Sequence, residues 1–161
     1  DFVEQIIEVL KPHYDFIIID THNQLTELEL RIFDNSSLIM LVMTMELTFI
    51  KNTKLLLDLL IRSKIPREKI KVVLNRAFKS MGLEPAKVEK SLRYAVSHFI
   101  PSEGNIVVPS VNQGMPFVLS KSSDGTAIFV AMRKLCASLT GEEIEKGTWN
   151  MFSLLKEVLG I

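Results

Sequence analysis

Two polar residues that directly follow apolar runs are the first candidates for chemistry in this sequence. Asp20 follows the apolar residues 16–19, and Asn75 follows the apolar residues 72–74. Short apolar runs of this kind are typical of strands buried on both faces of a parallel sheet. Ligands of open α/β sheets bind at the carboxyl ends of the strands. Asp20 is therefore placed to hold a cation, and the Asn75 amide, which both donates and accepts hydrogen bonds, can pair with the edge of a purine.

Each of these residues also has a purely structural interpretation. Asp20 could start a turn or cap the next helix, and Asn75 could start a turn. Pro101 and Ser102 close a further strand-like run, residues 97–100. Their backbone could lie against a base, or it could form a plain turn. The functional interpretation gains weight only because three of the predicted strands end in such residues.

The elements that must position these residues alternate along the chain. The periodicity predicts helices over residues 2–10, 25–33, 48–63 and 82–94, and a last helix that Asp124 caps and that ends near Leu139. Between them it predicts strands over residues 16–19, 38–43, 70–74 and 97–100. Alternation of this kind is typical of an α/β fold with a mainly parallel sheet and flanking helices.

Composition narrows the classes of function. The 161 residues suffice for one domain with a core, and 19 basic residues balance 19 acidic ones. That balance argues against a broad positively charged surface that binds the phosphates of DNA. The lone Cys136 excludes an internal disulfide and a cysteine-based zinc site. No run approaches the roughly 20 apolar residues of a membrane-spanning helix. We therefore expect a cytoplasmic protein, with a peripheral place at the inner face of the membrane as an alternative.

The order of these strand ends resembles the deviant Walker A ATPases of the ParA/MinD group. The resemblance rests on residues 14–21 (YDFIIIDT), 41–48 (LVMTMELT), 73–77 (VLNRA), 99–102 (FIPS) and 111–116 (VNQGMP). Within the group, the chain is most similar to the CpaE/TadZ-like branch, which serves the assembly and localisation of Flp pili. The resemblance implies a P-loop NTPase-like fold.

The resemblance also implies roles for individual residues. Asp20 matches the strand-end acid that orients magnesium, usually through water. Asn75, followed by Arg76, matches the adenine-reading position, and Pro101 with Ser102 matches the loop whose backbone passes the base. No catalytic residue is assigned, and Glu46, near the usual dimer face, is given no catalytic role.

Two departures from the family pattern affect these expectations. His22 and Asn23 stand where the family often has Pro-Pro or Pro-Arg; His22 could act as a general base, although a plain loop histidine is the favoured interpretation. None of the seven glycines precedes Lys-Ser or Lys-Thr, so the chain lacks the loop that cradles phosphates. We therefore expect the C-terminal portion of a longer ATPase, which binds ATP and magnesium only as the full-length protein.

The chain divides into residues 1–141, the ATPase-like part, and residues 142–161, a linker and an amphipathic C-terminal helix. That helix could contact a membrane, but it carries few basic residues, so packing on the protein is favoured. The leucine-rich helix 48–63 is either core or a dimer face.

We expect an ATP-dependent dimerisation switch that hydrolyses ATP in the full-length protein and serves pilus or polar-localisation partners. This segment alone is expected to be inactive. The alternatives are a non-catalytic interaction scaffold, or a DNA-partitioning protein of the ParA kind, which the neutral charge disfavours.

Overall fold

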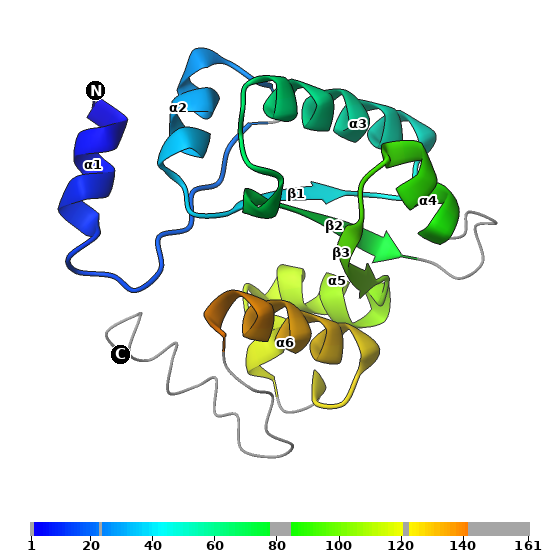
Figure 1. The fold of residues 1–161 in the computed structure, drawn as a ribbon. Helices are drawn as coiled ribbons and strands as arrows, with labels where there is room; N and C mark the ends of the chain where they lie inside the picture. Colours follow the sequence, from blue (N-terminus) through cyan, green and yellow to red (C-terminus); the bar gives the residue numbers. More distant parts are fainter. Residues whose placement is uncertain (1, 23, 78–84, 121–122, 142–161) are drawn as a thin grey trace.

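The computed structural model describes residues 2–22, 24–77, 85–120 and 123–141. Figure 1 shows a parallel sheet with helices packed around it. The elements are, in chain order, α1 (Phe2–Leu10), α2 (Glu27–Asn35), β1 (Ile39–Met43), α3 (Leu47–Arg62), the 3-10 turn η1 (Arg67–Lys69), β2 (Ile70–Ala77), α4 (Pro85–Leu92), β3 (Val96–Pro101), α5 (Gly104–Gln113), the 3-10 turn η2 (Phe117–Leu119) and α6 (Ala127–Thr140).

The sheet of the described residues has the order β1-β2-β3, and both pairs of strands are parallel. Met43 lies opposite Leu74, and Leu74 lies opposite Phe99. Since each connection between neighbouring strands contains a helix, the strands and helices form the crossover units predicted from the sequence. The predicted fold class, a mainly parallel sheet with flanking helices, is confirmed.

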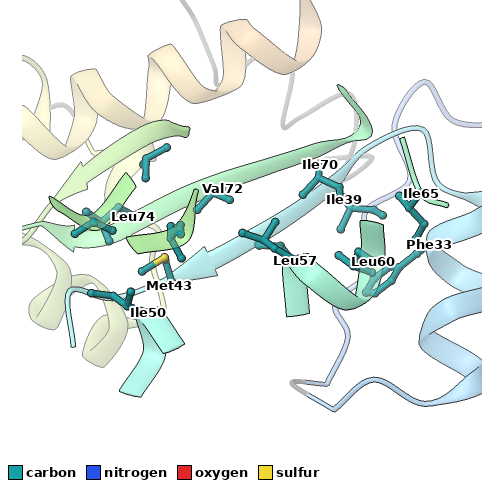
Figure 2. Close-up of a cluster of buried hydrophobic side chains, with 14 of the residues drawn as sticks. Phe33, Ile39, Met43, Ile50, Leu57, Leu60, Ile65, Ile70, Val72 and Leu74 are labelled. Atoms are coloured by element: carbon teal, nitrogen blue, oxygen red, sulfur yellow. The ribbon is translucent and has the colours of Figure 1, made fainter. Parts of the chain in front are cut away.

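The main core lies between one face of the sheet and helices α2, α3 and α4. Figure 2 shows side chains of β1 and β2 meeting Leu57 and Leu60 of α3. Both leucines and Val72 are at most 1% exposed. Alternate strand residues supply this face because successive side chains in a strand point to opposite sides.

The opposite face of the sheet is covered by α5 and α6. Val73 and Ile100 pack there against Ile128 and Leu135 of α6. Cys136 of α6 is half-buried, and burial raises the pKa of its thiol. Val42 of β1 also belongs to this face but is 60% exposed. The covering helices therefore protect the β2–β3 side more completely than β1.

The leucines of α3 were predicted to lie either in the core or on a dimer face, and the structure shows some of them buried and others exposed. Ile50, Leu57 and Leu60 are buried in the main core, whereas Leu55 and Leu59 are about half exposed. The helix therefore has one core stripe and one exposed apolar stripe, and the exposed stripe leaves the predicted dimer face untested.

The predicted strand over residues 16–19 is wrong. The segment is extended but joins no sheet, and Ile18 is 93% exposed. A buried strand needs a neighbour that supplies its ladder hydrogen bonds. Strands β1, β2 and β3 pair only with one another in the described part of the chain, so this apolar run has no such neighbour there.

Two further details of the helices differ from the prediction. Thr126, and not Asp124, is the N-cap of α6, and its Oγ1 accepts a hydrogen bond from the Phe129 amide at 3.4 Å. Gly125, at φ 79°, separates Asp124 from the helix. Helix α5 was not predicted, because Pro109 lies within it and proline normally interrupts a helix.

None of the helices in the described part of the chain combines the length and apolarity that a bilayer crossing requires. The expected linker and amphipathic helix over residues 142–161 lie outside the described residues.

Candidate functional site

The structure brings the predicted base-binding residues of two strands to one edge of the sheet. Ala77 of β2 lies opposite Pro101 of β3, and the Ser102 amide donates a hydrogen bond to the Ala77 carbonyl oxygen at 3.4 Å. Because parallel strands end at the same edge, Asn75 and Arg76 share this carboxyl edge with Pro101 and Ser102. The sequence expectation that these four residues lie near one another therefore holds, while their roles stay predictions.

The end of β2 has an unusual local geometry. The Asn75 Oδ1 accepts a hydrogen bond from the Arg76 amide at 2.9 Å. Arg76 has φ 52°, in the left-handed region that non-glycine residues seldom adopt. This bond fixes the orientation of the half-buried Asn75 amide. Its Nδ2 has no hydrogen-bond partner among the described residues and can donate to an acceptor nitrogen of a base.

The end of β1 adds polar groups to the same edge. Thr44 follows Met43, which lies opposite Leu74, and the Thr44 hydroxyl donates to the Glu46 carboxylate at 3.3 Å. Glu46 is the N-cap residue of α3, but its side chain makes no capping hydrogen bond. The Glu46 carboxylate is thus hydrogen-bonded to Thr44. The end of β1 therefore adds the Thr44 hydroxyl to this edge, a group that the sequence analysis did not single out.

Asp20 lies at the end of the exposed extended segment. Its side chain is exposed, and no hydrogen bond or ion pair joins it to Asn75 or Ser102 in the described part of the chain. The structure therefore does not connect Asp20 directly with the residues of β2 and β3. The carboxylate is accessible to a cation, as the metal-binding prediction requires.

The loop that follows Asp20 is held to the start of α2. Thr26 and Glu29 form a capping box, in which the Thr26 amide donates to the Glu29 Oε2 at 3.0 Å and the Thr26 hydroxyl bonds the same carboxylate. His22 Nδ1 lies 3.4 Å from the Glu29 Oε1. The side-chain hydrogen bond from Thr26 lowers the pKa of Glu29, which is only 3% exposed.

This contact gives His22 a structural role that the sequence analysis did not foresee. The signal was present in the sequence as a threonine followed three residues later by a glutamate, the pattern of a capping box. The neighbouring Asn23, which forms the other half of the departure from the family pattern, lies outside the described residues.

The residues of the β2 and β3 ends suit the base of a nucleotide, and Asp20, which lies outside the sheet, suits its cation. An exposed carboxylate such as Asp20 suits magnesium, which is usually held by one or two carboxylates together with phosphates and water. Within the described residues, no group of three or more His, Cys, Asp and Glu side chains gathers into a metal site. The chain contains no Gly-Lys-Ser or Gly-Lys-Thr, so its residues offer contacts to the base and the cation but no such loop for the phosphates.

The fold is shared with solved structures of a ParA family ATPase and of MinD cell division proteins. The chain superposes on a ParA family ATPase from Chlorobium tepidum with a TM-score of 0.74 at 20% identity, covering 83% of this chain and 55% of that one. It matches the MinD cell division protein of Aquifex aeolicus with a TM-score of 0.72 at 21% identity, over 88% of this chain and 60% of that one. A MinC:MinD cell division protein complex from Aquifex aeolicus matches at 0.66 and 23% identity, over 92% of this chain and 60% of that one.

These matches establish the fold and not the activity. No protein-family model matches the chain, and comparison with curated proteins gave no significant match. The chain spans 55% to 60% of the length of these three solved proteins. The ParA/MinD fold predicted from the strand ends is therefore confirmed.

Proposed function

We propose that this chain supplies the base-binding and magnesium-binding edge of an ATPase of the ParA/MinD group. In the full-length protein, ATP binding drives dimerisation, and the dimer serves as a localisation or assembly factor. The finer assignment is to the CpaE/TadZ-like branch, with pilus or polar-localisation proteins as partners. It rests on the resemblance of residues 14–21, 41–48 and 73–77 to that branch.

One observation carries the nucleotide proposal. Asn75, with its amide oriented by the Arg76 backbone, lies at the same carboxyl edge as the Pro101–Ser102 backbone. This is the place where α/β sheets bind ligands. A purine that receives a hydrogen bond from Asn75 at N1 would be flanked by the backbone of β3. The amide would then distinguish adenine, whose N1 accepts a hydrogen bond, from guanine, whose N1 carries a proton.

Each residue has a separate task in this proposal. When bound, the magnesium ion would neutralise phosphate charge. Asp20 would hold the ion, usually through water, and Asn75 would orient the base. The described edge supplies no lysine for the phosphates, so a phosphate loop would come from elsewhere in the full-length protein. This segment alone is expected to bind ATP weakly and to hydrolyse none.

The test compares variants of the full-length protein in binding fluorescent ATP, with unlabelled ATP and GTP as competitors and with or without magnesium. Asn75→Ala is expected to reduce the ATP-over-GTP preference by about tenfold, the value of one lost hydrogen bond to the base. Asp20→Ala is expected to weaken binding only when magnesium is present. Asn52→Ala, which alters an exposed asparagine of α3, serves as the control.

Other outcomes would favour the alternatives. A full-length protein that binds no ATP but still captures its partners would be a non-catalytic scaffold. A full-length protein whose DNA binding falls steeply with salt would favour a DNA-partitioning function. Unchanged selectivity in Asn75→Ala would remove the assigned role of that residue.

A further inference from the structure

Two neighbouring hollows lie away from the candidate nucleotide edge: residues at the start of β2 and β3 help to line one, and residues of α3 and the end of α4 line the other. Their volumes are about 650 Å³ and about 340 Å³. Arg67, Arg93 and Tyr94 line both hollows, so that together they form one groove, which we name the Tyr94 groove. At about 3.3 Å per strand residue, Ile70 in this groove lies about 16 Å from Asn75. The groove is therefore separate from the edge discussed above.

Tyr94 forms a fixed wall between the two hollows. Its hydroxyl lies 2.6 Å from the carbonyl oxygen of Arg67 and 3.1 Å from that of Ile70, and it donates to this pair. The Arg67 guanidinium lies over the ring, 5.4 Å from its centroid. Burial raises the pKa of Tyr94, so the phenol stays a neutral donor. The ring and the Arg67 guanidinium are thus held in place before any ligand binds.

Arg93 occupies a backbone position that favours glycine. Arg93 directly follows α4 and has φ 52°. The amide of the next residue, Tyr94, donates a hydrogen bond to the Glu89 carbonyl oxygen at 3.4 Å. This is the pattern of a Schellman cap, whose left-handed residue is usually glycine. A charged side chain is kept here at a steric cost. Part of the compensation is the favourable placement of a cation at a helix C-terminus.

Lys64 provides an internal comparison for Arg93. It follows α3 with φ 64°, and the next amide, that of Ile65, donates to the Leu60 carbonyl oxygen at 3.1 Å. Lys64 thus has the same backbone conformation and the same relation to a helix end, but it does not line the groove. Substitutions of Lys64 and Arg93 can therefore distinguish the effect of losing a cation at a helix end from the effect of losing a cation in the groove.

The smaller hollow has an excess of positive charge. It is lined by Lys54, Arg67 and Arg93 and by one acid, Asp58. None of these three cations forms an ion pair within the described residues. The apolar side chain of α3 that reaches the surface of this hollow is the half-buried Ile61, because Leu57 and Leu92 are only 1% and 2% exposed. A ligand that satisfies both features carries a carboxylate next to an apolar side chain.

The larger hollow is more nearly balanced in charge. It adds Lys71 and two acids, Glu68 and Glu89. The Glu89 carboxylate accepts a hydrogen bond from the Val96 amide at 2.8 Å, and the Lys71 ammonium donates to the Ser138 carbonyl oxygen at 3.3 Å. These two charges are already engaged by the protein. The guanidinium groups of Arg67 and Arg93 therefore remain the groups best suited to bind a carboxylate in a forked geometry.

We propose that the Tyr94 groove binds an acidic, partly apolar segment of a partner protein. Carboxylates of the segment would pair with Arg93 and Arg67, and its apolar side chains would cover the half-buried Ile61. Cationic side chains line both hollows and Ile61 lines the smaller one, an arrangement that suits an extended segment better than a lone anion. The proposal does not depend on nucleotide binding at the opposite edge.

The test uses the full-length protein and a short fluorescein-labelled peptide in which Glu and Leu alternate. Fluorescence anisotropy is expected to show saturable binding of this peptide and at least tenfold weaker binding of the matched Gln–Leu peptide. Arg93→Gly is expected to weaken binding of the Glu–Leu peptide about tenfold, as expected for the loss of a charge-assisted pair. Lys64→Gly, which makes the same chemical change at the other helix end, is expected to leave binding unchanged.

Both variants place glycine at a left-handed position, so both are expected to fold at least as stably as the parent. The absence of saturable Glu–Leu binding would overturn the proposal. Equal affinity for the Gln–Leu peptide, or equal losses in the two variants, would overturn it as well. Complete displacement of the peptide by millimolar inorganic phosphate would show a small-anion site instead.

Discussion

The clearest consequence of the packing concerns two adjacent leucines of α3. Leu60 is 0% exposed and belongs to the main core, whereas Leu59 is 47% exposed. Leu60→Ala removes buried methyl groups and leaves a cavity beneath the helix, at a cost of about 3–4 kcal/mol in the free energy of unfolding. Leu59→Ala makes the same chemical change on the same helix but leaves little cavity, so a cost below about 1 kcal/mol is expected.

These values can be measured by urea and thermal unfolding followed by far-ultraviolet circular dichroism. For a folded body of about 140 residues, the entropy of unfolding is about 0.3 kcal/mol per kelvin. Leu60→Ala should therefore lower the Tm by about 10 °C, and Leu59→Ala by about 3 °C or less. Equal losses in the two variants would refute the orientation of α3 on the sheet. If Leu59→Ala instead weakened only self-association, the exposed stripe would be the dimer face.

Two further predictions concern the capping box and a titrating histidine. Thr26→Ala removes the side-chain cap of α2 and should cost about 1 kcal/mol of stability, which Thr26→Ser should largely retain; equal losses in both would argue against the cap. His98 bonds the Ser138 hydroxyl at 2.9 Å, and burial, with the Lys71 charge, lowers its pKa from the usual 6.5. The folded state thus disfavours the protonated ring, so this stability contribution is present above about pH 6.5 and is lost as pH falls through the lowered pKa. His98→Gln should flatten the fall of Tm over that acidic range, and an unchanged profile would contradict the assignment.

The alternation of elements was predictable because the apolar periods are clear. Residues 38–43 form a continuous apolar run and residues 72–74 a shorter one, and the structure places strands β1 and β2 there. The same reasoning failed for residues 16–19. An apolar run indicates that a segment is suitable for burial as a strand. The run does not show whether a neighbouring strand is present to form the backbone hydrogen bonds that a buried strand needs. Helix α5 was missed for another reason, since Pro109 is tolerated within it.

The sequence could predict which residues of the candidate site share one sheet edge, but not their local geometry. Parallel strands must end at one edge, so Asn75 and Pro101 could be placed together from the order of elements alone. The left-handed Arg76 and its bond to Asn75 depend on the irregular register between β2 and β3, which a linear sequence does not reveal. The Tyr94 groove was likewise hidden, because it joins side chains of α3, η1 and α4 that only the tertiary packing brings together.

The central claim is that the carboxyl edge of this sheet faces the base of an adenine nucleotide. Photolabelling of the full-length protein with 8-azido-ATP and magnesium, followed by peptide mass spectrometry, tests it most directly. The account predicts labels within residues 75–77 or 101–103, and excess ATP should abolish them. Labels confined to other parts of the chain, or labels that ATP does not abolish, would contradict the account.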